Sequence, residues 1–258
     1  VGYVTAKRAC EVTIEKAKAT GISCVTFFNT YFSGRNSYYL DSIAKAGLIG
    51  IHAVSTPAWV APYGGRKPAL GVNPIGFAFP ADPHPIICDF GTASFMWGEI
   101  ILHRRMGRSL PEGVAIDPAG NETTDPQSAL DGAILPFGGH KGSTLNLAVQ
   151  LLGALSLQEA REDANEDFGF IFMAVDPKLF VDPEVYKANV QSIVSSVAKT
   201  PPRPGYEVRV PSSRSRRLHT EAAARGLVQV EKPVYERLRG IANNQIDVEP
   251  VEIRGASE

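Results

Sequence analysis

The sequence predicts an α/β domain in which helices cover a mixed or parallel sheet. A helical repeat of small and apolar residues over 6–17 stops at Gly21. The run over 22–28 is rich in β-branched and aromatic residues, which is typical of a strand. A second helical repeat over 38–46 and a second strand-like run over 48–54 follow. This β–loop–α–β order predicts the fold class.

The rest of the chain continues the alternation of strands and helices. Proline and glycine are dense over 57–74 and 111–136, which predicts irregular loops there. The run over 168–175 is almost entirely apolar, as in a strand from the centre of a sheet. Further strands are expected over 75–79 and 86–88, and further helices over 93–106, over 183–197 and from 214 onward.

The composition excludes several classes of protein. The 26 Lys and Arg and 27 Asp and Glu residues give a net charge of −1, so no general field favours nucleic acid or a membrane surface. Cys10, Cys24 and Cys88 lie apart in apolar segments, which favours reduced thiols in a cytoplasmic protein. No apolar run has transmembrane length, and no cysteine–histidine cluster predicts a metal site.

The segment Gly138–Ser143 carries the most specific ligand-binding signal. It reads Gly-Gly-His-Lys-Gly-Ser before an apolar run over 145–155, which predicts a glycine-rich turn that leads into a buried helix. Helix N-terminal amides and the Lys141 ammonium together suit a phosphate-bearing ligand. No Gly-x-Gly-x-x-Gly follows a strand, and the order of Lys141 and Gly142-Ser143 is wrong for a P-loop. The predicted site is therefore non-Rossmann.

Seven short segments, in order along the chain, together resemble one enzyme family. That family is the malate/L-lactate dehydrogenase-like group of NAD(P)-dependent oxidoreductases, which is unrelated to the Rossmann lactate dehydrogenases, and the resemblance spans about residues 2–226. The segments are Ala44–Gly50, Pro62–Gly65, Gly71–Ile75, Asp89–Ser94, Pro111–Gly113, Thr123–Pro126 and Leu135–Gly142.

The resemblance implies a fold and an organisation that periodicity alone does not. It implies a predominantly antiparallel, seven-stranded cofactor-binding sheet flanked by helices, in a cytoplasmic homodimer. Residues 18–215 would form the NAD(P)-binding and catalytic domain. Residues 1–17 and 216–258 would form a helical part that packs with an N-terminal segment missing from this chain.

The resemblance also implies a set of residues that bind NADPH or NADH. Val72 stands where a substrate-contacting threonine is common. Asp89 has an alternative role as the cap of the helix that follows it, and Arg35 and Arg214 have one as solvated surface residues. The implied cofactor-binding residues are Tyr31, Phe32, Ser33, Gly34, Arg35, Thr56, Asp89, Phe90, Gly91, His140, Lys141, Pro211, Ser212, Ser213 and Arg214.

Within the family, the chain is most similar to the ketimine reductases, which act on piperideine-2-carboxylate and pyrroline-2-carboxylate. Glu99 follows Gly98 where hydroxyacid dehydrogenases commonly carry lysine, and a carboxylate there would suit a cationic iminium, so we expect Glu99 to be catalytic. A solvated helix position is the alternative for Glu99. Phe32 replaces the histidine that is the proposed proton carrier of the hydroxyacid branch, and phenylalanine transfers no proton.

Three functions follow from these residues. The sequence favours an NAD(P)H-dependent reductase of a small cyclic imino acid. The second is a 2-hydroxyacid dehydrogenase of malate or lactate type, against which Phe32 argues. The third is a nucleotide-binding homologue that has lost its catalytic activity.

Overall fold

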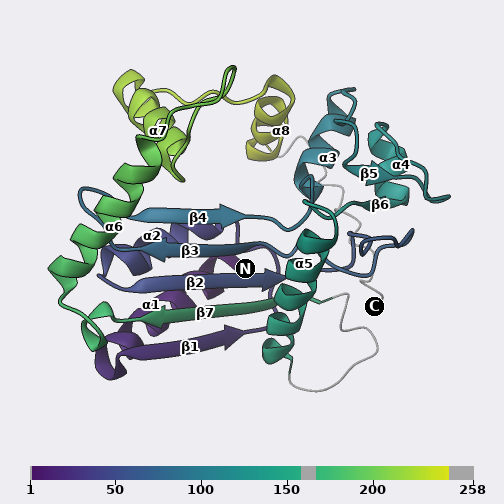
Figure 1. Cartoon of the computed structure of the whole chain (residues 1–258). Coiled ribbons are helices and arrows are strands. Elements are labelled where there is room, and N and C mark those ends of the chain that lie inside the picture. Colours follow the sequence, from purple (N-terminus) through teal and green to yellow (C-terminus); the bar gives the residue numbers. More distant parts are fainter. Residues whose placement is uncertain (1, 158–166, 244–258) are drawn as a thin grey trace. The chain divides into compact units, whose positions relative to one another are not determined.

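The computed structural model describes residues 2–157 and 167–243 of the chain (Figure 1). The chain divides into two compact units, Val1–Ser212 and Ser213–Glu258. The described part of the second unit consists of α7 (Ser213–Arg225) and α8 (Lys232–Ala242). The described β-strands all lie in the first unit.

The main sheet of the first unit has five strands in the order β1-β7-β2-β3-β4, and every neighbouring pair is antiparallel. The antiparallel sheet implied by the family resemblance is confirmed. A single sheet of seven strands is not, because two short strands, β5 (Ala115–Ile116) and β6 (Ala133–Ile134), pair separately. The five strands are β1 (Ile22–Phe27), β2 (Ile49–Ser55), β3 (Ile75–Phe79), β4 (Ile86–Phe90) and β7 (Gly169–Val175).

The parallel pairing suggested by the β–loop–α–β order is wrong. β1 and β2 run in the same direction, but β7 lies between them and is antiparallel to both. Phe172 of β7 stands opposite Val25 of β1 and opposite His52 of β2. The run over 168–175 is therefore an interior strand, as its continuous apolar sequence predicts.

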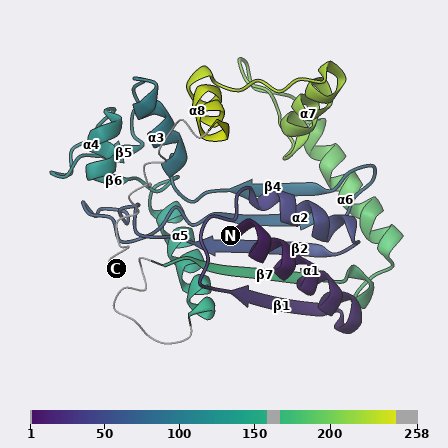
Figure 2. The ribbon, with the colours of Figure 1, turned by 180° about the vertical axis from the view of Figure 1, so that it is seen from behind.

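Helices lie on both faces of this sheet. α1 (Gly2–Thr20) and α2 (Asn36–Lys45) cover one face, as Figure 2 shows from behind. Phe170 and Phe172 pack in the core that includes α1, whereas Ile171 between them packs against Val149 of α5 (His140–Gly153). Because successive strand residues point to opposite faces, α5 lies on the other face.

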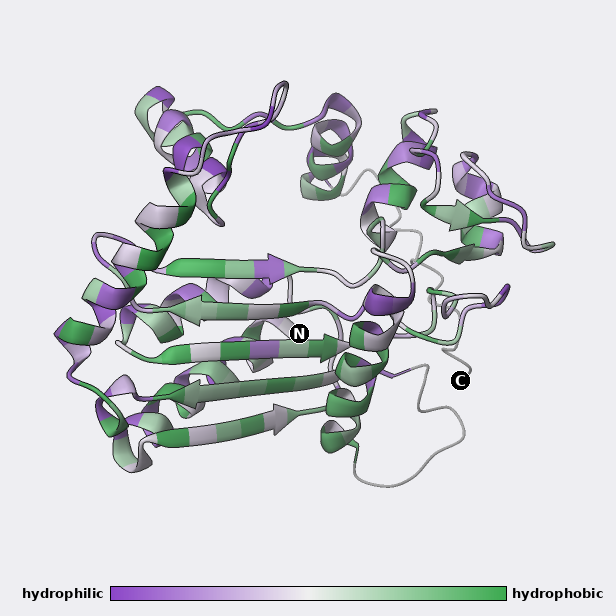
Figure 3. Ribbon diagram, viewed as in Figure 1, coloured by the Kyte–Doolittle hydropathy of each residue, from purple (hydrophilic) through white to green (hydrophobic). Residues whose placement is uncertain are grey.

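The expectation of a buried helix after the glycine-rich turn holds for one side of the helix only. α5 buries one narrow side, Gly142, Asn146, Val149 and Gly153. Its other side is apolar but exposed, and Leu147 and Leu151 retain 48% and 64% of their accessible surface. In Figure 3 several turns of this helix are green, the colour of apolar residues. Apolar content alone does not tell a buried helix from a half-exposed one.

The remaining helices of the first unit follow the predicted order with shifted boundaries. α3 (Trp97–Arg105) begins four residues later than expected, because residues 93–96 continue the loop after β4. α6 (Pro183–Ala198) begins at a proline behind the N-cap Asp182, whose carboxylate accepts two backbone hydrogen bonds. The loop over 111–136 also holds α4 (Pro126–Asp131), which Asp125 caps.

His52 is a buried titratable group at the centre of the sheet. Its ring is fully buried and stacks on Phe172 with 3.8 Å between the ring centroids, and its Nδ1 lies 2.9 Å from the Ile171 carbonyl oxygen. Burial lowers the pKa of His52 to about 4, although the hydrogen bond to the Ile171 carbonyl oxygen opposes this. The nearby Tyr39 has a pKa raised by burial, so it does not titrate in the same range.

We expect the free energy of unfolding to fall by up to about 3 kcal/mol as the pH falls from 6.5 towards 4, because the unfolded histidine binds a proton that the folded one excludes. His52→Gln should remove this contribution and lower the pH slope by up to one proton. Urea unfolding at several pH values measures both proteins. Equal slopes for the two would contradict the assignment to His52.

Candidate active site

Most motifs singled out in the sequence meet at one end of the sheet. Thr56 follows β2, Asn73 and Pro74 precede β3, and Gly91 follows β4. The register places Ala53 opposite Ile75 and Ile75 opposite Phe90, so these three strand ends are neighbours. The antiparallel order therefore brings together residues that lie up to 35 positions apart in the sequence.

Asn73 lies at the centre of this end and is fully buried. Its side-chain oxygen accepts a hydrogen bond from the Thr56 amide at 3.0 Å. Its side-chain nitrogen donates to the Asn146 side-chain oxygen at 2.6 Å and to the Gln150 side-chain oxygen at 2.8 Å. Asn146 in turn donates to the Gly71 carbonyl oxygen at 2.8 Å. The loop before β3 is thus tied to β2 and to α5 by buried amides.

The loop after β4 is held to the same point. Thr92 donates from its amide and from its hydroxyl to the Val72 carbonyl oxygen, at 3.0 and 3.1 Å. Val72 itself is buried, and its amide donates to the Thr56 hydroxyl at 2.9 Å. A Cβ on Gly91 would stand 2.6 Å from the sulfur of Met96, so only glycine fits this loop without a shift.

The glycine-rich turn presents His140 and Lys141 in the first turn of α5, where both are exposed. Gly138 and Gly139 have φ angles of 61° and 62°, a region that favours glycine. Gly139 is the N-cap and supplies no side-chain acceptor, so the first amides of the helix stay available for a ligand. With Lys141 beside them, these amides are suited to an anionic group, and the phosphate binding expected from the sequence stays a prediction.

Asp89 organises the edge of the sheet next to this site. Its carboxylate accepts a hydrogen bond from the Ser37 amide at 2.9 Å, so it caps α2 rather than the helix that follows it. Although part of its surface is exposed, burial of the carboxylate raises the pKa of Asp89 against the opposing effects of Ser37 and of the Arg35 charge. Ser212 reaches the same strand, because its hydroxyl donates to the Ile87 carbonyl oxygen at 2.9 Å.

The loop over 31–35 rests on the start of β7. The rings of Tyr31 and Phe32 are 58% and 50% exposed and meet the Phe168 ring edge-on, with 6.0 and 5.4 Å between the centroids. Ser33 is buried, and its carbonyl oxygen accepts a hydrogen bond from the Tyr39 hydroxyl at 2.5 Å. Gly34 has a φ of 79°, which lets the chain turn there.

Of the expected site residues, Glu99 has a partner within its own helix, and Ser213 and Arg214 belong to the second unit. Glu99 is exposed in the first turn of α3, and its carboxylate accepts from the Met96 amide at 3.4 Å, which gives it a structural role in its own helix. Ser213 and Arg214 begin α7 in the second unit. Phe90 and Phe137, by contrast, lie next to each other, with 6.1 Å between the ring centroids.

Sequence reasoning missed the buried amides that hold the site together. The segment Gly71–Ile75 includes Asn73, but none of the family-like segments includes Asn146 or Gln150. Their signal was available, because two amide side chains four residues apart stand on one face of a helix. Nothing in the sequence around Thr92 predicts its buried hydrogen bonds, apart from its place after Gly91.

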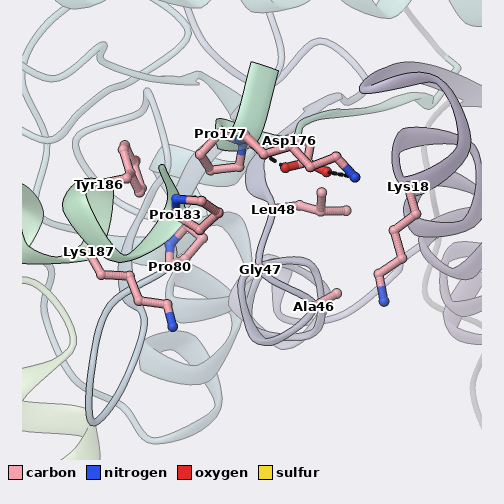
Figure 4. A pocket seen from close by; sticks show the side chains of 11 residues that line it. Lys18, Ala46, Gly47, Leu48, Pro80, Asp176, Pro177, Pro183, Tyr186 and Lys187 are labelled. Carbon is pink, nitrogen blue, oxygen red and sulfur yellow. Dashed lines mark hydrogen bonds and ion pairs between the residues drawn. The ribbon is translucent and has the colours of Figure 1, made fainter. Parts of the chain in front are cut away.

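A cavity of about 400 Å³ lies at the opposite end of the sheet (Figure 4). Leu48 precedes β2, Pro80 follows β3 and Asp176 follows β7 there. Among the described residues, two of the three lysines that line it form ion pairs with carboxylates. Lys178 pairs with Asp176 at 2.8 Å, and Lys187 pairs with Glu184 at 3.0 Å. This cavity is therefore not the anion site predicted from the glycine-rich turn.

The described residues contain no group of three or more His, Cys, Asp or Glu side chains that could hold a metal ion. Within the same residues, no helix combines the length and the apolar character that crossing a membrane requires.

The chain is similar to proteins of one family. The family model for malate/L-lactate dehydrogenase matches residues 1–239. The malate/(S)-sulfolactate dehydrogenase of Methanothermus fervidus is 34% identical over 252 residues, which cover 94% of this chain and 73% of that protein. The Delta(1)-pyrroline-2-carboxylate reductase 1 of Burkholderia ambifaria is 35% identical over 240 residues, which cover 88% and 68%.

Solved structures agree with these similarities. The sulfolactate dehydrogenase from Methanocaldococcus jannaschii matches with a TM-score of 0.80 and 33% identity, over 94% of this chain and 72% of that one. The delta1-piperideine-2-carboxylate reductase from Pseudomonas syringae matches with a TM-score of 0.72 and 27% identity, over 91% and 72%. The similarity therefore does not single out the ketimine reductases, which the sequence analysis favoured.

Gly142 provides a test of how tightly the glycine-rich turn packs on α5. A Cβ at Gly142 would overlap the Phe137 carbonyl oxygen, so Gly142→Ala should lower the free energy of unfolding by about 1–3 kcal/mol. Gly98→Ala is the matched control, because a Cβ there meets nothing within 4 Å and alanine favours the helix by about 0.5–1 kcal/mol. Urea unfolding compares the two variants. A neutral Gly142→Ala would contradict the described packing.

Proposed function

Because this chain belongs to the malate/L-lactate dehydrogenase family of NAD(P)-dependent oxidoreductases, we propose that it transfers a hydride between a nicotinamide dinucleotide and C2 of a small 2-oxo or 2-hydroxy carboxylate. The observation that carries the proposal is the similarity over 94% of the chain to dehydrogenases named for malate and sulfolactate. Both of those substrates carry a second anionic group, so we propose a dianionic substrate.

The geometry supports a dinucleotide at the end of the sheet described above. We propose that the first amides of α5 and Lys141 hold a phosphate of the dinucleotide, because an uncapped helix N-terminus with an adjacent cation favours anions. Arg35 offers a further cation at the edge near Asp89. When bound, the dinucleotide supplies the hydride. The protein residues would orient the substrate against it and exclude water.

The reduction of a 2-oxo acid also needs a proton on the new hydroxyl oxygen. Phe32 cannot supply it. This single residue favours a second candidate function, the reduction of a small cyclic imino acid, whose iminium nitrogen already carries its proton. Curated relatives named as pyrroline-2-carboxylate reductases match 88% of the chain. In that reaction Glu99 would be the carboxylate that faces the cationic substrate.

The test is the oxidation of NADPH and of NADH with oxaloacetate, sulfopyruvate, pyruvate or piperideine-2-carboxylate, followed through the absorbance of the reduced nicotinamide. Turnover of the dianionic oxo acids is the expected result. Turnover of the cyclic imine alone would overturn the first candidate in favour of the second, and Glu99→Gln should then lower kcat. Binding of NADPH without turnover of any substrate would identify a homologue that has kept its cofactor site and lost its chemistry.

Phe32→His should raise turnover of 2-oxo acids by at least about 10-fold, because a positioned general acid contributes about 10²–10⁴-fold. Phe32 is half exposed, so the substitution should leave the fold intact. Tyr31→His is the matched control, since Tyr31 is an exposed neighbour that packs on the same Phe168 ring. Steady-state kinetics measure both variants. An equal gain in both, or none in Phe32→His, would show that position 32 is not where the proton is needed.

A further inference from the structure

We propose that Asn73 is a positioning residue that fixes the two halves of the active site relative to each other. The strand half consists of Thr56, Val72 and Gly91, at the ends of β2 and β4 and before β3. The helix half is the first turn of α5 with Lys141. The catalytic consequence of this inference rests on the proposed function, but the linkage itself does not.

The strand half is held by the oxygen atoms of Asn73. Its side-chain oxygen accepts from the Thr56 amide at 3.0 Å, and its backbone oxygen accepts from the Thr92 hydroxyl at 3.0 Å. The same Thr92 hydroxyl and amide meet the Val72 carbonyl oxygen. One residue therefore contacts both the segment after β2 and the segment after β4.

The helix half is held by the side-chain nitrogen of Asn73. It faces three acceptors on α5, namely the Asn146 carbonyl oxygen at 3.2 Å, the Asn146 side-chain oxygen at 2.6 Å and the Gln150 side-chain oxygen at 2.8 Å. Lys141 lies five residues before Asn146 on the same helix, about 7.5 Å along its axis. Because the intervening turns are regular helix, a shift at Asn146 moves Lys141 as well.

The chemistry of the site requires asparagine at position 73. The Thr56 amide needs an acceptor and the α5 oxygens need a donor, so the orientation of the amide is determined by its partners. The backbone of Asn73 has a φ of 36°, which asparagine tolerates better than most residues. Because Asn73 is fully buried, no water is at hand to replace a lost hydrogen-bond partner. Its side-chain amide is therefore held in one orientation.

Two variants separate these requirements. Asn73→Gly keeps the backbone conformation and removes the amide, whereas Asn73→Asp keeps the acceptor for Thr56 and removes the donor towards α5. A carboxylate at this position would face three oxygen acceptors, and its protonated form would again be a donor. Thr13→Val is the matched control, because Thr13 is also fully buried and hydrogen-bonded, but it lies in the middle of α1.

We expect both Asn73 variants to lose at least about 100-fold in kcat/KM, mainly through kcat, because misplacement by about 1 Å can cost 10²-fold. Asn73→Asp should recover part of this loss as the pH falls, relative to the unmutated protein, and Asn73→Gly should not. Thr13→Val should lower stability and leave kcat and KM unchanged. If the Asn73 variants lose only stability, as Thr13→Val does, the residue is structural and the proposal is wrong.

A second readout does not depend on turnover. Hydrogen exchange of the Thr56 amide and the dissociation constant for NADPH should both rise in Asn73→Gly, while Thr13→Val should change neither. If the unmutated protein turns over none of the substrates, these two measurements still decide the matter. Unchanged exchange and unchanged NADPH binding in Asn73→Gly would overturn the linkage, independently of the reaction that the protein catalyses.

Discussion

The insertion of β7 between β1 and β2 is the interaction on which the rest of the first unit depends. β7 forms antiparallel pairs along both of its edges. Phe170 stacks on Phe27 with 4.5 Å between the centroids and joins the core under α1, while Ile171 joins the core under α5. Both layers of the domain are therefore built on one strand. Because β7 begins where the loop over 31–35 rests, its position also fixes that loop, which is proposed to form one side of the active site.

The close approach of α5 to this sheet explains where the proposed anion site lies. Gly153 packs against Ser55, so a small residue lets the end of the helix lie against β2. Gly142 packs against the Phe137 carbonyl, so a second small residue lets the preceding turn fold onto the start of the helix. Between these two glycines, Asn146 contacts the sheet side through hydrogen bonds with Asn73 and Gly71 rather than through apolar packing. The large residues point outward instead. A helix seated in this way has little freedom to slide, and its N-terminus stays beside the loops after β2 and β4.

The sequence was sufficient to predict most elements and the region of the site. The limits of β3 agree with the run over 75–79, and the antiparallel sheet follows from the family resemblance. The neighbours of β7 could not be predicted, because strand order depends on contacts between segments more than 100 residues apart. The same holds for the cap that Asp89 provides to α2 across 52 residues. Local patterns report periodicity and turns, and they do not report which distant groups satisfy a buried amide.

The double engagement of Asp89 limits the ways in which this edge of the protein can change its charge. The carboxylate caps α2 through the Ser37 amide and also faces Arg35. Removing it would take away an acidic group and, at the same time, a helix cap that typically contributes about 1 kcal/mol. Arg35 has no comparable second task among the hydrogen bonds and ion pairs of the described residues. A substitution that alters the anion preference proposed for this edge therefore costs less stability at position 35 than at position 89.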